Sequence, residues 1–588
     1  MRSLDMLVRR AAAWWGAHPA ATLFLVAVAL GGVAGLLSAA FWNAIAALSA
    51  VVSFYLVRPA DQAVALPWPW ASWAFLMPAL GGLLVGWLAH FVFRTPERLG
   101  VPGVMLDARR EWGRISLRYV PATFVNGTVT IGTGGSAGRE APVVAMGGGL
   151  GAWVARRLRV PPAQRRLLVG CGAAAAIAAA FNAPLAGVFF AVEVLLGDWR
   201  TGTLAPVMLA SVAGTVACRA AEGSADASHF QVAGYQLASW WEPVLYAGLG
   251  LVAGGVGHLF AAAVQRAEKL FAQLPTRPWL RPAVGGVGVG LLGLAAPGAL
   301  GNGYPWAIAA CEGTLTWQVM LLLVGAKIAA TALTLGSGGW GGDFAPTLLV
   351  GAVTGGVYGV LLATVLPGWV AGAGAYAMVG MGAVLAAVIR CPVTAVLLLF
   401  ELTGTYEVVL PAMVAVTAAI AVAGKISPLG LYHRRLRDLG GPAFEVLGGE
   451  LAELPVRSLM RPLTEVLPAD APLKFVLRRA SESPQLVFPV VRRDGGMIGV
   501  VRLADLRFNL HEHDTDGLPV VAADVAVEEV PHVYAEDSAQ KAAALLAEAA
   551  WEELPVLENA RSEVPIGLVS RHDVLRATLS PAGGGPPE

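Results

Sequence analysis

Charged residues are scarce in this chain, and their distribution is uneven. Asp, Glu, Lys and Arg make up only 14% of the 588 residues, whereas soluble proteins carry about 25%. Residues 1–440 contain 17 acidic residues and residues 441–588 contain 23. The deficit therefore predicts a lipid-embedded domain over 1–440 and a soluble domain over 441–588. A net charge of +1 gives no sign of the basic surface that nucleic-acid binding requires.

Cysteine is also rare, which argues against functions that depend on cysteine-ligated metals. Four cysteines lie in separate apolar segments, and their spacing fits no metal site, so we interpret them as small buried hydrophobic residues. No nucleophile–base set accompanies them, so we expect no enzyme and no cofactor in the membrane part. The four are Cys171, Cys218, Cys311 and Cys391.

Apolar runs, by contrast, are abundant. The stretch 20–57 is too long for a signal peptide and predicts a first, tilted membrane helix. Residues 344–389 contain no charge at all. Many other apolar pieces are too short to span a bilayer and are cut by Gly and Pro, which is tolerated only where the freed backbone is buried or lines a cavity. This pattern favours an all-α, multi-span transporter or channel with broken helices.

The apolar part repeats itself at a nearly constant offset. GGSAGREAP at 134–142 is echoed by GSGGWGGDFAP at 336–346, with the prolines 204 residues apart. Val169-Gly-Cys-Gly is echoed by Val379-Gly-Met-Gly. The stretch from Pro184 to Glu193 is echoed by the stretch from Pro392 to Glu401, with the prolines and the glutamates each 208 residues apart. Two halves with matching interruptions predict inverted repeats with a binding site at their interface.

The soluble tail divides in two. Residues 455–510 and 520–579 each predict the order strand, helix, strand, strand, helix, with matching segments FPVV at 488–491 and LPVL at 554–557. This pattern resembles a tandem pair of CBS motifs, an α/β module. Basic residues 433–437 follow the last span, so we expect both termini and this module on the cytoplasmic side.

Three glycine-rich turns enter apolar helices, and they carry the candidate chemistry. A dehydrated anion needs a positive potential without a tight trap, which unpaired N–H groups at helix N-termini provide. Glycine allows close approach, and proline in the first helical turn removes no needed donor. The turns are LGVP at 99–102, GREAP at 138–142 and GGDFAP at 341–346.

Together with FNAPLAG at 181–187, FELTG at 400–404 and a tyrosine after the last long span, these turns resemble the CLC family of chloride channels and transporters. The resemblance covers residues 20–435. It implies transport of chloride or a similar anion, a homodimer in membrane lipid, and, given the composition, a bacterial inner plasma membrane.

The resemblance also assigns roles by position. Glu140 matches the gating glutamate, whose carboxylate occupies an anion site when ionised. Tyr432 matches the tyrosine whose hydroxyl faces the central anion. The remaining anion-binding positions implied are Leu99, Gly100, Gly138 and Arg139, together with Asp343 and Phe344 through their backbone N–H groups.

Three departures from the family pattern affect the expected mechanism. Leu99 stands where most members place Ser and so removes a hydroxyl donor. Asp343 adds a negative charge beside an anion-binding turn. Val194 occupies the position of the proton-transferring glutamate of CLC antiporters and cannot titrate. The last departure favours a gated, channel-like protein.

Other hypotheses remain open beside the channel. A proton-coupled chloride antiporter would need another proton route, such as water or Glu193. A fluoride exporter is disfavoured because Pro142 stands where that branch has Thr. A membrane-anchored nucleotide sensor is disfavoured because Glu140 and its glycines are present. Within the CBS pair, Ser570 and Asp573 fit the ribose-holding pattern for an adenine nucleotide, and a purely structural module is the alternative.

Overall fold

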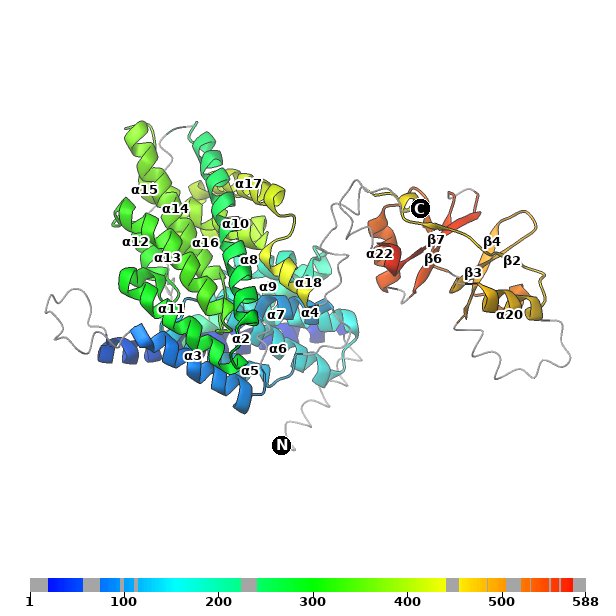
Figure 1. The fold of residues 1–588 in the computed structure, drawn as a ribbon, viewed down its shortest axis with the longest axis horizontal. Coiled ribbons are helices and arrows are strands. Elements are labelled where there is room, and N and C mark those ends of the chain that lie inside the picture. The colour runs from blue at the N-terminus through cyan, green and yellow to red at the C-terminus, as the bar shows by residue number, and fades with distance from the viewer. Residues whose placement is uncertain are drawn as a thin grey trace. The chain divides into compact units, whose positions relative to one another are not determined.

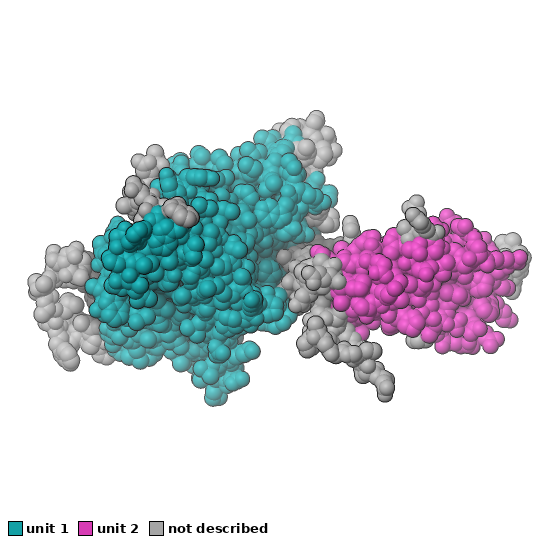
Figure 2. All heavy atoms as spheres, turned by 90° about the horizontal axis from the view of Figure 1, so that it is seen from above, with its two compact units in different colours: residues 1–439 teal, residues 440–588 magenta. Residues whose placement is uncertain are grey.

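The structure, a computed structural model, describes most of the chain. The described residues are 19–56, 75–95, 100–109, 115–223, 239, 241–439, 454–483, 485–503, 520–528, 530–548, 551–559 and 562–574. The chain forms two compact units, residues 1–439 and 440–588 (Figure 2).

The first unit is helical throughout its described part (Figure 1). The first-half helices are α2 (Pro19–Leu56), α3 (Met77–Trp87), α4 (Gly100–Arg109), α5 (Tyr119–Gly132), α6 (Glu140–Leu158), α7 (Pro162–Phe181), α8 (Pro184–Phe190) and α9 (Thr201–Glu222). The second-half helices are α10 (Pro243–Gln273), α11 (Arg281–Ala295), α12 (Tyr304–Cys311), α13 (Trp317–Gly336), α14 (Phe344–Val365), α15 (Ala373–Ile389), α16 (Pro392–Thr403), α17 (Val409–Ile426) and α18 (Leu431–Asp438).

Helix lengths in this unit agree with a multi-span membrane protein of broken helices. Six helical stretches among the described residues are long and apolar enough to cross a bilayer. Others are too short: α16 has 12 residues, which at about 1.5 Å per residue leaves it well short of the hydrocarbon core. Proline in the first turn opens α8 and α16, and the residues before α8 and α16 are non-helical. The interruptions predicted from Gly and Pro are therefore real.

The repeat seen in the sequence appears as reciprocal contacts between the halves. The backbone N–H of Ser136 donates to Thr334 Oγ1 at 3.0 Å, and that of Trp340 donates to Thr130 Oγ1 at 3.1 Å. Each residue has its counterpart 204 positions later. Such exchanged pairs are what two similar halves related by a two-fold axis would make.

Close packing between helices also occurs at matching places in the two halves. A Cβ on Gly147 of α6 would lie 2.2 Å from the carbonyl oxygen of Gly172 on α7. In the second half, a Cβ on Gly351 of α14 would lie 2.4 Å from the oxygen of Gly380 on α15. Both helix pairs therefore depend on glycine for their backbone approach, which is common between membrane helices.

The second unit is α/β and contains two small sheets. Strands β1 (Arg461–Pro462), β7 (Pro565–Ser570), β6 (Glu553–Leu557) and β5 (Val533–Tyr534) form one sheet in that order. Strands β2 (Leu467–Pro468), β3 (Val487–Val491) and β4 (Met497–Arg502) form the other, with helices α20 (Leu473–Glu482) and α22 (Ala539–Glu548). The antiparallel pair β1–β7 joins the start of the first motif to the sheet of the second.

Candidate functional site

Glu140 begins α6, and its carboxylate lies at the N-terminus of another helix. The side chain is 1% exposed. Its Oε2 accepts from the backbone N–H of Ala345, in the first turn of α14, at 3.4 Å. Its Oε1 accepts from the hydroxyl of Tyr304. A helix N-terminus attracts negative charge, so this carboxylate occupies the kind of place that a bound anion would take.

Backbone pairing between two glycine turns creates this place. Gly138 and Gly342 exchange both N–H···O bonds, each at 2.7 Å. A Cβ on Gly138 would lie 2.1 Å from Glu140 Oε2 and 3.0 Å from the nitrogen of Ala345. Gly138 is therefore needed for the carboxylate to fit, which explains the glycine in the turn before α6.

Tyr304 was not identified from the sequence, although a signal was present. It is the first residue of α12, it follows Gly303 at φ +86°, and Pro305 comes next. This is another glycine–proline entry into a short apolar helix, like the three turns singled out above. Because Tyr304 lies 164 residues from Glu140, only the fold could show that the two side chains meet.

A buried lysine holds the loop that leads into Tyr304. Lys327 of α13 is 0% exposed. Its Nζ donates to the carbonyl oxygens of Ala299 at 3.1 Å and Gly301 at 2.7 Å. Charged groups inside a membrane unit need such partners. Lys327 therefore fixes the turn from which Tyr304 reaches Glu140.

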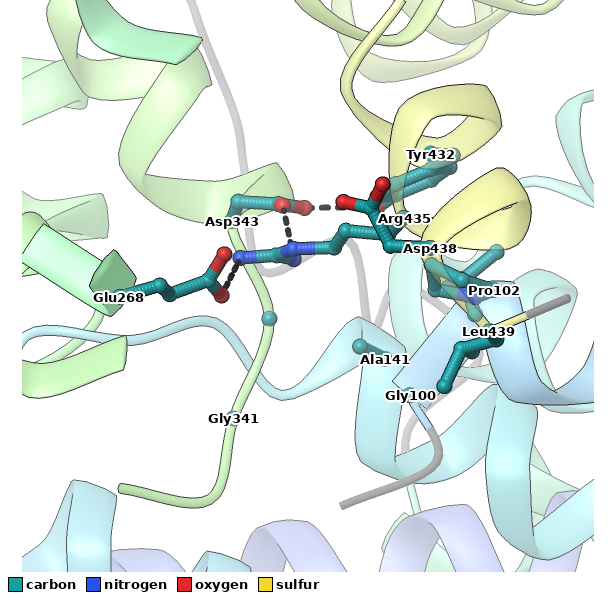
Figure 3. Close-up of a pocket in the computed structure, with 12 residues that line it drawn as sticks. Gly100, Pro102, Ala141, Glu268, Gly341, Asp343, Tyr432, Arg435, Asp438 and Leu439 are labelled. Carbon is teal, nitrogen blue, oxygen red and sulfur yellow. Dashed lines mark hydrogen bonds and ion pairs between the residues drawn. The ribbon is translucent and has the colours of Figure 1, made fainter. Parts of the chain in front are cut away.

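A cavity of about 220 Å³ lies beside these turns (Figure 3). The N-termini of α4, α6 and α14 all contribute to its walls. Glu140 itself is not among the lining residues. The lining residues are Gly100, Val101, Pro102, Ala141, Glu268, Gly341, Gly342, Asp343, Tyr432, Arg435, Asp438 and Leu439. The structure thus brings Gly100, Asp343 and Tyr432 together at one cavity.

The hydroxyl of Tyr432 is engaged with protein rather than free to meet an anion. It donates to Asp343 Oδ1 at 2.7 Å. Arg435 lies 3.3 Å from Asp343 Oδ2 and 2.6 Å from Glu268 Oε1. Figure 3 shows the Arg435 guanidinium between the carboxylates of Glu268 and Asp343. Asp343 was expected to contribute its backbone N–H, and the structure adds a role for its side chain.

The other predicted anion-binding residues are placed differently. The Arg139 guanidinium donates to the carbonyl of Ala180 and lies 4.0 Å from the centroid of the Trp42 ring, so it is not among the cavity-lining residues. The Phe344 ring packs 5.1 Å from that of Phe181. Leu99 lies outside the described residues.

Glu193 and Glu401 make matching structural contacts. Glu193 accepts from the backbone N–H groups of Val393 and Thr394, at 3.0 and 2.8 Å. Glu401 accepts from those of Leu185 and Ala186, at 2.9 and 2.7 Å. Each glutamate thus satisfies the open N-terminus of the helix from the other half.

Comparison with protein families agrees with these features. The family model described as voltage gated chloride channel matches residues 81–424, and the CBS domain model matches 456–512 and 521–580. The chain belongs to the CLC family. It is a multi-pass membrane protein that transports chloride or a similar anion, and it is not an enzyme.

Relatives of this CLC protein carry both kinds of name. The ClcB-like chloride channel protein of Ralstonia nicotianae is 36% identical over 63% of this chain and 86% of the relative. The H(+)/Cl(-) exchange transporter ClcA of Cronobacter sakazakii is 33% identical over 70% of this chain and 88% of the relative. Among solved structures, a eukaryotic CLC transporter aligns with a TM-score of 0.64 at 21% identity, over 94% of this chain and 97% of that one.

Replacing Tyr304 by Phe should make it easier for the Glu140 carboxylate to leave its position at the N-terminus of α14. A hydrogen bond to a charged group contributes about 1.5–3 kcal/mol, so the equilibrium between seated and displaced carboxylate should shift by about tenfold or more. We expect faster chloride efflux from liposomes at a pH where the parent is slow. Tyr376→Phe is the matched control, because its hydroxyl donates to the buried Glu242 at 2.8 Å. Equal effects of both variants would contradict the prediction.

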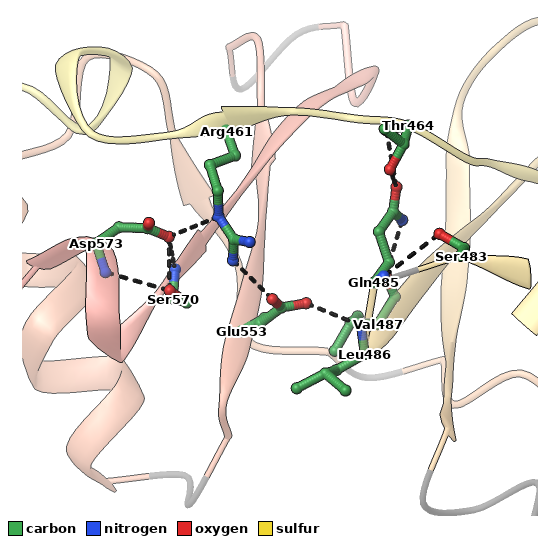
Figure 4. A network of polar contacts seen from close by, with 9 residues as sticks. All are labelled: Arg461, Thr464, Ser483, Gln485, Leu486, Val487, Glu553, Ser570 and Asp573. Atoms are coloured by element: carbon green, nitrogen blue, oxygen red, sulfur yellow. Dashed lines mark hydrogen bonds and ion pairs between the residues drawn. The ribbon is translucent and has the colours of Figure 1, made fainter. Parts of the chain in front are cut away.

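The candidate nucleotide residues of the CBS pair are occupied by protein contacts (Figure 4). Asp573 Oδ2 accepts from the Ser570 hydroxyl at 2.6 Å, from the Ser570 backbone N–H at 2.8 Å and from Arg461 Nε at 3.0 Å. Arg461 also donates to Glu553 Oε1 at 2.7 Å. The backbone N–H of Asp573 donates to the Ser570 hydroxyl oxygen at 3.2 Å, so Ser570 caps the short helix that follows β7. The geometry accounts for both residues structurally.

Replacing Ser570 by Ala should therefore destabilise the second unit by about 1 kcal/mol, the usual value of a helix cap. Hydrogen exchange across β6 and β7 in the full chain would measure this loss. Ser481→Ala is a suitable control, because Ser481 is exposed and its hydroxyl bonds only the nearby carbonyl of Arg478. If ATP slowed exchange in the parent and not in Ser570→Ala, the nucleotide hypothesis would hold instead.

Proposed function

We propose that this CLC protein exchanges chloride for protons, with Glu140 as the gate and the proton carrier at the outer end of the pathway. Chloride–proton exchange is the activity named for the Cronobacter sakazakii relative, which aligns over 88% of its length. A proton-coupled antiporter was the alternative in the sequence analysis, and this relative supports it over the channel hypothesis.

The observation that carries this proposal is the position of the Glu140 carboxylate. It lies against the N–H of Ala345 and the hydroxyl of Tyr304, both of which favour an ionised acceptor. Protonation would remove the charge that holds it there and would free the helix N-terminus for chloride. One carboxylate can therefore alternate between excluding chloride and binding a proton, which links the two fluxes.

A channel is the second candidate, and Val194 favours it. Its side chain is 2% exposed and cannot titrate, although a proton crossing a dry region needs a titratable relay. Both carboxylate oxygens of Glu193 accept hydrogen bonds at the N-terminus of α16, so Glu193 does not supply the missing proton relay. Coupled exchange in this protein therefore requires that protons reach Glu140 through water or through another group.

Reconstitution of the full chain into liposomes distinguishes the two candidates. A chloride gradient is imposed, and chloride efflux and proton uptake are recorded together. Exchange predicts proton movement against its own gradient, in fixed ratio to chloride. Chloride efflux with no proton movement would overturn the exchange proposal and establish the channel.

The surroundings of the transport domain follow from the same family relation. We propose a homodimer in the bacterial inner membrane, with the two halves of each subunit inverted, and with the CBS pair and both termini in the cytoplasm. The basic residues after α17 support this orientation. Arg435 counts less toward this orientation, because its charge is paired with Asp343 and Glu268. The hydrogen bonds of Ser570 to Asp573 argue against binding of an adenine nucleotide at the CBS pair.

A further inference from the structure

Asp343 occupies a position where an aspartate usually caps its own helix, and it does not do so. It directly precedes α14, and no side-chain capping bond is present at this end of the helix. Its side chain is only 1% exposed. Helix capping, in which a carboxylate bonds the N-terminus of its own helix, therefore does not explain the orientation of the Asp343 side chain.

The carboxylate is directed instead at the donors of the cavity (Figure 3). Its Oδ1 accepts the Tyr432 hydroxyl and its Oδ2 faces Arg435. A tyrosine hydroxyl has a single proton to donate. While that proton is bonded to Asp343, Tyr432 cannot donate it to a chloride ion in the same cavity.

The charge of the cavity wall also disfavours a bound anion. Three carboxylates line it, those of Asp343, Glu268 and Asp438, against the one guanidinium of Arg435. Arg435 is itself shared between two of the three. A wall with excess negative charge repels an entering anion, so this cavity admits chloride only when a carboxylate is displaced or neutralised.

Two carboxylates thus lie near the start of α14, and that of Glu140 is the one that bonds its backbone. Glu140 reaches the N–H of Ala345 from α6, and Asp343 stands two residues before that N–H, on the cavity side. We propose that Asp343 is a second tethered carboxylate, which competes with the transported anion for Tyr432 and closes the cavity end of the pathway. This inference rests on the proposed anion transport through Glu140, and it does not depend on whether that transport is coupled to protons.

The proposal predicts that removing the Asp343 charge strengthens anion binding. At an effective dielectric of about 20, a unit charge about 5 Å from an anion changes its affinity by well over tenfold, and Arg435 offsets part of this. We expect Asp343→Ala to bind chloride at least about tenfold more tightly, as measured by calorimetry on the full chain, and to speed chloride efflux from liposomes. Asp343→Asn should do the same to a smaller extent, because its amide oxygen still accepts from Tyr432.

Two further variants separate this role from a structural one. Glu268→Gln removes one wall carboxylate from the same arginine without touching Tyr432, so chloride affinity should rise less than it does in Asp343→Ala. In a Tyr432→Phe background, the gain from Asp343→Ala should shrink towards that from Asp343→Asn, because the contested hydroxyl is gone. Unchanged or weaker chloride binding by both Asp343 variants, with transport intact in the parent, would overturn the inference alone. A parent that neither binds nor moves chloride would refute the proposed function and this inference with it.

Discussion

Replacing Glu140 by Ala is expected to abolish proton movement while leaving chloride movement open and independent of pH. The substitution removes the carboxylate that both binds the proton and occupies the N-terminus of α14. With the Glu140 carboxylate gone from the N-terminus of α14, chloride meets its free N–H groups at every pH. In the liposome assay, proton uptake should fall to background, and the chloride efflux rate should become flat across pH.

Glu312→Ala provides the comparison for this variant, because Glu312 is an exposed glutamate at the end of α12. It should leave both fluxes as in the parent. If chloride efflux through Glu140→Ala stayed as sensitive to pH as in the parent, another group would be the gate. If proton uptake persisted, Glu140 would not be the proton carrier.

Replacing Glu193 by Ala is expected to destabilise the membrane unit strongly. The glutamate accepts two backbone N–H bonds at the start of α16, and its Oε2 also accepts the hydroxyl of Thr394 at 2.6 Å. In a bilayer, orphaned backbone donors cost several kcal/mol. We expect a loss of about 3 kcal/mol or more, measured as a lower unfolding temperature of the detergent-purified chain.

Glu401→Ala tests whether this role is structural. Glu401 makes the matching contacts at the start of α8, so the two variants should lose stability to a similar extent. The conservative Glu193→Gln should restore much of the stability and keep the parent ratio of protons to chloride. A Glu193→Gln variant that folds normally, yet loses proton uptake when Glu401→Gln does not, would identify Glu193 as the missing relay.

The sequence pointed to the candidate site through its glycine- and proline-containing turns rather than through its charges. Glu140, Gly138 and Gly100 were identifiable because glycine and proline mark where a chain enters an apolar helix. Tyr304 carried the same mark at Gly303 and Pro305 and was passed over, because the α12 segment is only eight residues long. Lys327 was also missed, since a single lysine in an apolar helix does not reveal its partners.

Side-chain direction was beyond the reach of the sequence. Asp343 was expected to serve through its backbone N–H, and Tyr432 to face an anion. Instead their side chains bond each other at 2.7 Å across 89 residues. Similarly, Arg139 lies within the GREAP turn, yet its guanidinium packs on Trp42. Rotamers at such positions depend on neighbours that arrive from distant segments.

The sequence by itself determined the membrane character, the division near residue 440, the repeat at offsets of 204 and 208, and the family. These features are local or periodic, and composition and spacing record them directly. Only the tertiary structure decided which donors face which carboxylates, because hydrogen bonds such as Tyr304 to Glu140 join residues with no sequence relation. The proposed function depends on those pairings, because each N–H or O–H donor bonded to a protein carboxylate is one for which a chloride ion would have to compete.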